Sequence, residues 1–287
     1  MRQTNASTIA TFDLTSRCPL RCRHCYVRED LVEDLDDDTY IARLVALRDA
    51  HQLRSALWVG GEPLLRLPLL RRATSLFARN AVSTSAALPV PPDLGAGLLV
   101  SVEGPRDEHE LLRGRGTFDD VLANIGELEP GSFALSTTLT APTLAAIDAL
   151  GELVDETRAL GVLVGFYVGP PGDPLSVRRG DRNWAVDRLH ALQAKRPGVV
   201  LNTPAGLDRL RAENARELAR SCIYRRGAMA FDSALERKRP CTFGARANCG
   251  ACGCAVVAEQ VARALDTPAA GALLAALFPV RPLQPPS

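Results

Sequence analysis

Short apolar runs alternate with amphipathic stretches along the first two-thirds of the chain. The apolar runs predict strands at 8–14, 55–59, 81–87, 97–102, 133–139 and 162–168. The stretches between them predict helices at 37–52, 66–79, 117–128, 142–160 and 181–195. Apolar strands that alternate with helices indicate an α/β fold with a parallel sheet. Six such units predict a partial (β/α)6 TIM-type barrel, because a full eightfold barrel typically needs about 250 residues.

The alternation stops near residue 205, and this predicts a boundary. Residues 1–204 would form the barrel, and residues 205–287 would form a small cysteine-rich C-terminal extension. Helical patterns at 205–220 and 256–278 flank the cysteines of that extension.

Composition narrows the class of protein. Of 287 residues, 46% are hydrophobic and 23% are charged, and the formal net charge is +1, as in ordinary soluble globular proteins. A net charge near zero argues against a nucleic-acid partner, and the apolar runs are too short for a membrane span. Residues 1–17 contain no apolar signal region, so we expect a cytoplasmic protein. A chain this long needs no disulfides, so its eight cysteines point to metal binding or chemistry.

The cysteines fall into two groups separated by a long cysteine-free stretch. Three lie near the start and five near the end: Cys18, Cys22 and Cys25, then Cys222, Cys241, Cys249, Cys252 and Cys254. This distribution predicts two separate metal-binding regions joined by a scaffold.

The first group has the spacing C-x3-C-x2-C directly after a predicted strand. Three thiolates on one loop suit an iron–sulfur cluster, whose fourth iron would stay open. A zinc site would need a fourth protein ligand. His24 is adjacent to Cys25 and is poorly placed to close the same tetrahedron.

The segment LTSRCPLRCRHCYV resembles the cysteine loop of the radical S-adenosylmethionine (radical SAM) superfamily. The resemblance implies a [4Fe–4S] cluster whose open iron binds the amino and carboxylate groups of S-adenosylmethionine. It also implies reductive cleavage of that cofactor to a 5′-deoxyadenosyl radical. His24 holds a position whose neighbourhood usually packs on the adenine in the family, although simple loop packing is the alternative. Tyr26 is a further candidate cofactor contact.

A second motif supports the resemblance. Gly60, Gly61, Glu62 and Pro63 follow the predicted strand 55–59. In the family, a Gly-Gly-Glu-Pro stretch ends the second strand and meets the amino group of S-adenosylmethionine. Glycines permit close backbone approach, and a carboxylate pairs with an ammonium group. Alone, this stretch would be read as an ordinary turn between a strand and a helix.

Residues 100–128 extend the resemblance to the branch that contains peptide- and protein-modifying enzymes. Ser101 matches the family's strand and is a candidate contact for the methionine or ribose end of the cofactor. Glu103 is a second candidate, although aspartate is usual at its position. Arg113 either pairs with a carboxylate or remains solvated.

Four C-terminal cysteines have the spacing C-x7-C-x2-C-x-C from Cys241. Cysteine-rich extensions of the SPASM or twitch type are common in this part of the superfamily, so the resemblance implies an auxiliary [4Fe–4S] cluster. The spacing departs from the usual pattern of either type, and a structural zinc site is the alternative. Cys222 is either a distant ligand or a free thiol.

The resemblance implies a radical SAM enzyme that modifies a peptide or protein side chain. A small-metabolite substrate, including adenosyl transfer to it, is the first alternative. A non-catalytic iron–sulfur or zinc protein is the second. The enzyme would need a flavodoxin- or ferredoxin-type electron donor.

Overall fold

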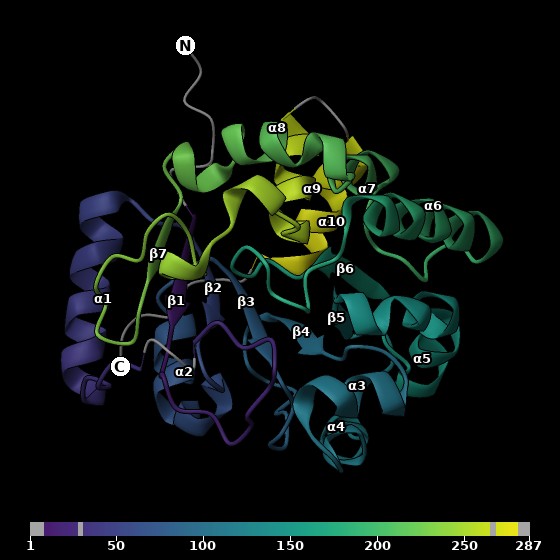
Figure 1. Cartoon of the computed structure of the whole chain (residues 1–287). Coiled ribbons are helices and arrows are strands. Elements are labelled where there is room, and N and C mark those ends of the chain that lie inside the picture. Colours follow the sequence, from purple (N-terminus) through teal and green to yellow (C-terminus); the bar gives the residue numbers. More distant parts are fainter. Residues whose placement is uncertain (1–8, 28–30, 265–267, 281–287) are drawn as a thin grey trace.

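Parallel strands form the centre of the molecule (Figure 1). In the computed structural model, the described residues, 9–27, 31–264 and 268–280, contain a seven-stranded sheet. Its strands are β1 (Ile9–Asp13), β2 (Ser55–Val59), β3 (Arg79–Thr84), β4 (Gly97–Ser101), β5 (Phe133–Leu139), β6 (Val162–Phe166) and β7 (Met229–Phe231). Thr8 of the first predicted strand and residues 265–267 of the last predicted helix lie outside the described residues.

The strand order is β6-β5-β4-β3-β2-β1-β7, and every neighbouring pair is parallel. From β1 to β6 the sheet follows the order of the chain, as successive βα units require. The outer strands β6 and β7 do not pair with each other, so the sheet is open. The predicted α/β fold with a partial barrel is therefore confirmed.

Helices connect the strands and flank the sheet in Figure 1. They are α1 (Asp37–His51), α2 (Leu67–Thr74), α3 (Arg106–Arg113), α4 (Thr117–Ile125), α5 (Leu150–Thr157), α6 (Arg179–Lys195), α7 (Pro204–Arg209), α8 (Ala215–Arg220), α9 (Ala255–Ala264) and α10 (Pro268–Leu277). The predicted helix 142–160 is divided into a 3-10 helix, Ala141–Ala149, and α5. Neither α3 nor β7 is among the elements predicted from the pattern, and β7 has only three residues.

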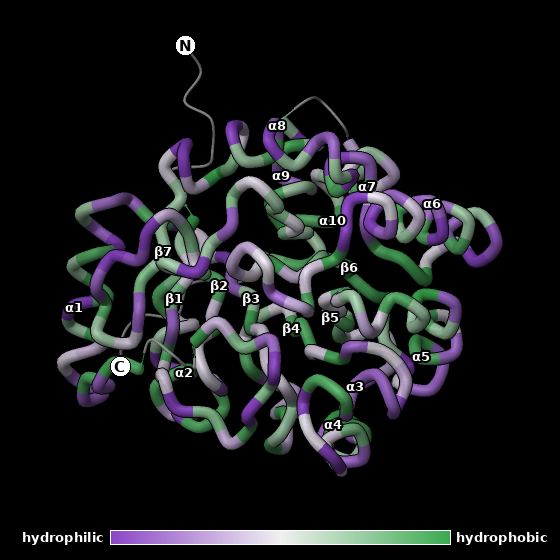
Figure 2. Tube along the Cα trace, viewed as in Figure 1, coloured by the Kyte–Doolittle hydropathy of each residue, from purple (hydrophilic) through white to green (hydrophobic). Residues whose placement is uncertain are grey.

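Aromatic side chains join β7 to the centre of the sheet. The Phe12 ring on β1 stacks on Trp58 of β2 at 5.1 Å and on Phe231 of β7 at 5.3 Å. All three side chains are buried. Figure 2 shows the same organisation, with hydrophobic strands inside and hydrophilic stretches along the outer helices.

The last described helix also packs on the sheet. Leu277 and Phe278, at the end of α10, form a buried cluster with Ala81, Leu99 and Leu163 of three strands. The boundary near residue 205 stays a prediction, and residues beyond it contribute both a strand and part of the core.

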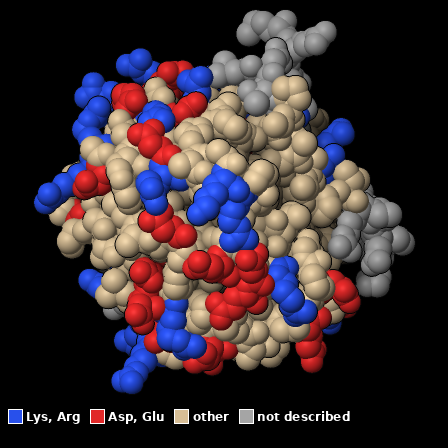
Figure 3. Space-filling model, turned by 90° about the vertical axis from the view of Figure 1, so that its right-hand side faces the viewer, with Lys and Arg blue, Asp and Glu red and all other residues tan. Residues whose placement is uncertain are grey.

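Charged side chains of both signs are interspersed over the face shown in Figure 3, next to an area with few charges. Exposed ion pairs also involve α6 and the residue after it: Arg188 pairs with Asp148, and Arg196 pairs with Asp155. Among the described helices, none is long and apolar enough to cross a membrane.

Candidate active site

The three N-terminal cysteines lie on a loop that begins where β1 ends. We call residues 14–27 the N-terminal cysteine loop. Its first residue, Leu14, donates its backbone N–H to Val59 O at 2.9 Å. The loop therefore leaves the sheet at the carboxyl end of a parallel strand, which is the edge where α/β proteins place their sites.

Two glycines allow the following turn to pack directly against this loop. Gly61 N donates to Thr15 O at 2.8 Å, and Gly60 has a φ of 120°. A Cβ atom added at Gly61 would lie 2.0 Å from the carbonyl oxygen of Arg17. The two backbones could not approach so closely with any side chain at position 61. The glycines are thus required by the cysteine loop itself, in addition to any contact with a cofactor.

Glu62 is fully buried and its carboxylate accepts four hydrogen bonds. One oxygen accepts from Leu64 N at 3.1 Å and from Thr84 Oγ1 at 2.7 Å. The other accepts from Ser85 N and Ser85 Oγ. Pro63 begins the 3-10 helix Pro63–Arg66. Glu62 therefore fixes this turn to the end of β3, and its predicted contact with an amino group stays a prediction.

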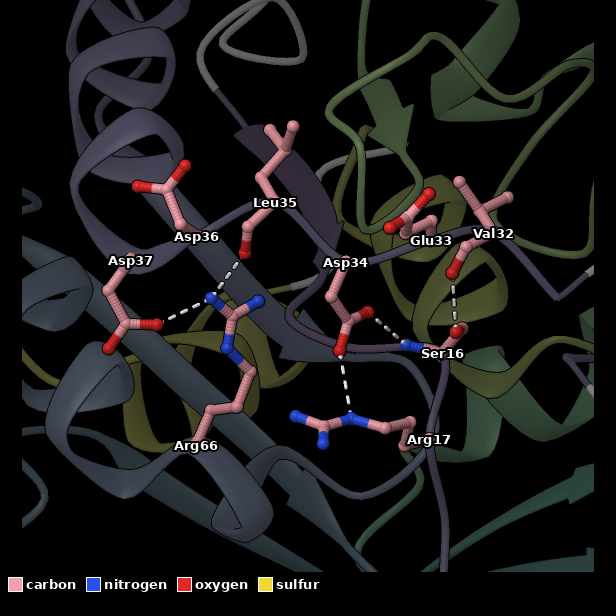
Figure 4. A pocket seen from close by; sticks show the side chains of 9 residues that line it. All are labelled: Ser16, Arg17, Val32, Glu33, Asp34, Leu35, Asp36, Asp37 and Arg66. Atoms are coloured by element: carbon pink, nitrogen blue, oxygen red, sulfur yellow. Dashed lines mark hydrogen bonds and ion pairs between the residues drawn. The ribbon is translucent and has the colours of Figure 1, made fainter.

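The base of the loop is held from its other side (Figure 4). Asp34 accepts hydrogen bonds from Thr15 Oγ1 at 2.5 Å and Ser16 N at 3.0 Å. Arg66, which is buried, donates to the carbonyl oxygens of Leu14 and Leu35. Asp34 and Arg66 line a surface pocket of about 570 Å³, and their hydrogen bonds in its wall anchor the loop.

The three thiols of the loop lie close enough to influence one another. Burial, together with the neighbouring Cys22 and Cys25, raises the pKa of Cys18 to about 11. Arg113 Nη1 lies 3.9 Å from Cys22 Sγ and would favour its thiolate. Thiols with a nearby cation are suitable iron–sulfur ligands, so this loop fits a cluster.

A buried carboxylate connects the loop to β4 and β5. Glu103 Oε1 accepts from Arg113 Nε at 2.9 Å and lies 3.2 Å from His24 Nε2, and Oε2 accepts from Thr138 N at 2.7 Å. Burial opposes ionisation of Glu103, but Arg113 and His24 outweigh it and hold its pKa well below the usual range. Of the two alternatives for Arg113, pairing with a carboxylate is correct. The predicted cofactor contacts of His24 and Glu103 stay predictions, as does that of Ser101, which ends β4 opposite Ser136.

Tyr26 links the N-terminal cysteine loop to the C-terminal extension. Its ring meets Phe243 edge-on at 5.1 Å, and Lys238 Nζ lies 5.0 Å from the ring centre. Lys238 also forms a 2.6 Å ion pair with Asp13, whose pKa burial raises to about 6 against the effect of the ammonium group. Sequence reasoning missed this pair, although Asp13 directly precedes the loop and Lys238 is one of only two lysines.

All five C-terminal cysteines line one pocket, which we call the tail pocket. Its other walls are largely apolar and include Val168, Ala219, Phe243 and Val257. The fold thus brings Cys222 to the other four cysteines. Burial raises the pKa of the Cys241 thiol to about 12, so this thiol keeps its proton until a metal replaces it. Thiols in an apolar pocket suit an iron–sulfur cluster or zinc.

The described residues contain no group of three or more His, Cys, Asp or Glu arranged around a single metal ion. A [4Fe–4S] cluster does not require such a group, because its cysteines bind separate irons and need not converge on one point.

Residues 12–129 match the family model of the radical SAM superfamily. The matched range includes the N-terminal cysteine loop, Gly60–Pro63 and Glu103. The chain therefore contains a radical SAM domain in this range.

One curated relative and two solved structures extend this comparison. An AdoMet-dependent heme synthase of Methanosarcina barkeri (strain Fusaro / DSM 804) is 27% identical over 206 residues. The match covers 63% of this chain and 54% of that protein, so the chain spans about half the length of this relative.

Streptococcus suis SuiB bound to precursor peptide SuiA has a TM-score of 0.57 and 12% identity, covering 79% of this chain and 57% of SuiB. The protein anSMEcpe with bound AdoMet and Cp18Cys peptide has a TM-score of 0.63 and 15% identity, covering 94% of this chain and 83% of anSMEcpe. At these identities, the likeness is one of fold.

Proposed function

We propose that this chain cleaves S-adenosylmethionine at a [4Fe–4S] cluster held by Cys18, Cys22 and Cys25, and modifies a peptide or protein side chain. The observation that carries the proposal is the N-terminal cysteine loop, which is fixed to Gly60–Gly61 at the carboxyl edge of the sheet. When bound and reduced, such a cluster supplies the electron that cleaves the sulfonium and releases a 5′-deoxyadenosyl radical. A flavodoxin- or ferredoxin-type protein would deliver that electron.

The chain's own residues would hold this site rigid. Glu62 fixes the Gly60–Gly61 turn that packs on the cysteine loop, and Asp34 binds the start of the loop at Ser16. The Glu103–Arg113 pair holds the loop at His24. Glu62 and Glu103 are fully buried, and the side chains of Arg113 and His24 are 9% and 11% exposed, so these residues restrict the movement of the cysteines.

The tail pocket supports an auxiliary [4Fe–4S] cluster in the same enzyme. Its five cysteines are the main metal-binding side chains of the pocket, and Phe243 of its wall touches Tyr26, next to Cys25. A substrate radical that loses an electron would have an acceptor within the same chain.

Two substrate classes have support. The structural neighbours SuiB and anSMEcpe are each recorded with a bound peptide, which favours a peptide. The sequence relative is named a heme synthase, and it favours a tetrapyrrole as the second candidate.

Anaerobic reconstitution with iron and sulfide, followed by reduction in the presence of S-adenosylmethionine, tests the reaction. We expect 5′-deoxyadenosine and about eight irons per chain, as two [4Fe–4S] clusters require. Cys22→Ala should abolish 5′-deoxyadenosine, and the matched variant Cys249→Ala should lower only the iron content of the tail pocket. The proposed cleavage is rejected if wild-type protein forms no 5′-deoxyadenosine.

Substrate class is tested with the same reconstituted protein. A peptide substrate predicts a mass change in that peptide that depends on Cys22 and on S-adenosylmethionine. A tetrapyrrole substrate predicts a saturable change in the absorbance of an added iron tetrapyrrole. A tetrapyrrole absorbance change without a peptide mass change would reject the peptide proposal in favour of a tetrapyrrole substrate.

A further inference from the structure

A buried arginine of α6 holds the backbone of the C-terminal cysteine segment. Arg182 is 4% exposed. It donates from Nη1 to Ala251 O at 3.0 Å, from Nη2 to Cys252 O at 2.6 Å, and from Nε to Leu210 O at 2.5 Å. Its guanidinium lies 4.9 Å from the centre of the Phe166 ring. The side chain therefore connects α6, β6 and the segment between Cys249 and Cys254.

The positive charge of Arg182 has no carboxylate partner in the described part of the chain. Among the residues that the structure describes, Arg182 takes part in no ion pair. By contrast, the buried Arg66 pairs with Asp37, and Arg113, whose side chain is 9% exposed, pairs with Glu103. Carbonyl oxygens satisfy the N–H donors, but they do not neutralise the charge. Burying a charge without a counter-charge is strongly unfavourable, so an anion is expected beside it.

The C-terminal cysteines are the candidates for that anion. The Arg182 guanidinium donates to the carbonyl oxygen of Cys252, so the thiolates that a bound metal would require lie on the segment it contacts. Glu213 also favours the cation, but its carboxylate already accepts a hydrogen bond from Asn183 and is exposed.

The same segment is fixed from β6. Phe166 N donates to Gly253 O at 2.9 Å, and a Cβ atom at Gly253 would lie 2.6 Å from Phe166 Cβ. Three successive carbonyl groups, those of residues 251, 252 and 253, are therefore held by α6 and β6. This leaves the segment little freedom to move when its thiols bind a metal.

We propose that Arg182 is a positioning residue for a C-terminal [4Fe–4S] cluster, fixing the cysteine segment and supplying the positive charge that balances the cluster. The inference rests on the auxiliary cluster proposed above. Four thiolates give a [4Fe–4S] cluster a net charge of about −2, which becomes about −3 on one-electron reduction. A buried cation stabilises the more negative form more strongly, so Arg182 raises the reduction potential.

Redox titration with dithionite, followed by electron paramagnetic resonance, tests this role. A Cys22→Ala background removes the N-terminal cluster, so that the signal comes from the C-terminal cluster. Arg182→Gln keeps planar N–H donors but loses the charge. At the midpoint potential of the protein with Arg182, the variant should show an about tenfold lower ratio of reduced to oxidised cluster. That ratio corresponds to a midpoint lower by about 59 mV for one electron.

Two further variants separate charge from structure. Arg182→Lys keeps the charge and should recover most of the potential. Arg188→Gln changes an exposed arginine of the same helix, paired with Asp148, and should leave the midpoint unchanged.

Three outcomes would overturn the inference. Zinc, or no more than about four irons, in the wild-type protein removes the auxiliary cluster and the inference together. Two clusters in the wild type with equal midpoints in Arg182→Gln and wild type remove only the role of Arg182. If Arg182→Gln retains no C-terminal iron, the result for Arg182→Lys decides. The inference is supported if Arg182→Lys keeps its C-terminal iron with a midpoint near that of the wild type. It is overturned if Arg182→Lys loses that iron or has a lowered midpoint.

Discussion

A buried glutamate on α9 makes the stability of this protein depend on pH. Glu259 is fully buried, and its carboxylate accepts hydrogen bonds from Thr203 N at 3.0 Å and Thr203 Oγ1 at 2.8 Å. It joins the C-terminal extension to the residues just before α7. Burial raises the pKa of Glu259 from 4.5 to about 7, against the lowering effect of the Thr203 hydrogen bonds.

The sign and the size of the pH dependence of stability follow from this pKa shift. Between pH 4.5 and about 7 the folded state keeps a proton that the unfolded state has released, so stability falls as pH rises through this window. Each pKa unit is worth about 1.4 kcal/mol, which gives a total cost of about 3 kcal/mol above pH 7. From pH 5.5 to pH 8 the expected loss is about 2 kcal/mol.

Glu259→Gln imitates the protonated carboxyl and should remove this dependence. Urea unfolding of wild type and variant at each pH gives the difference in free energy of unfolding, in which the titration of other groups cancels. The variant should gain about 2 kcal/mol relative to wild type between pH 5.5 and 8. Glu217→Gln, at an exposed glutamate of α8, is the control. A difference that does not change with pH would refute the reasoning.

Two further substitutions test the loop and its link to the extension. Gly61→Ala would place a Cβ 2.0 Å from Arg17 O, so we expect loss of the N-terminal cluster, measured as about four fewer irons with the C-terminal iron retained. Lys238→Met leaves Asp13 buried without its ammonium partner and should lower the free energy of unfolding by about 3–5 kcal/mol, measured by urea denaturation.

Each of these has a matched control. Gly180→Ala changes a glycine of α6 whose added Cβ would meet nothing within 4 Å, and it should keep all iron. Adding Asp13→Asn to Lys238→Met removes the unpaired charge and should recover part of the lost stability. Full iron in Gly61→Ala, or no recovery in the double variant, would contradict the respective argument.

Much of the fold was predictable because its signals are local. The strands Ser55–Val59 and Phe133–Leu139 have the predicted bounds, since a buried parallel strand is a continuous apolar run. The cysteine spacing and Gly60–Pro63 were recognisable for the same reason. The strand β7 was missed because its three residues become a strand only through pairing with β1.

Site details that depend on distant residues could not be predicted. Glu103 was proposed as a cofactor contact, and the sequence does not reveal that Arg113 and His24 occupy one of its carboxylate oxygens. The Asp13–Lys238 pair joins residues 225 positions apart, which no local pattern reports.

By itself, the sequence determined the parallel α/β scaffold and the radical SAM motif, because the residues that define each pattern lie close together in the chain. Only the tertiary structure decided that Cys222 joins the other C-terminal cysteines in one pocket, and that Arg182 lies beside them as a buried cation without a carboxylate in the described chain. The physical reason is that the environment of a charge or a thiol is set by packing between elements, and packing joins residues that are far apart in the chain.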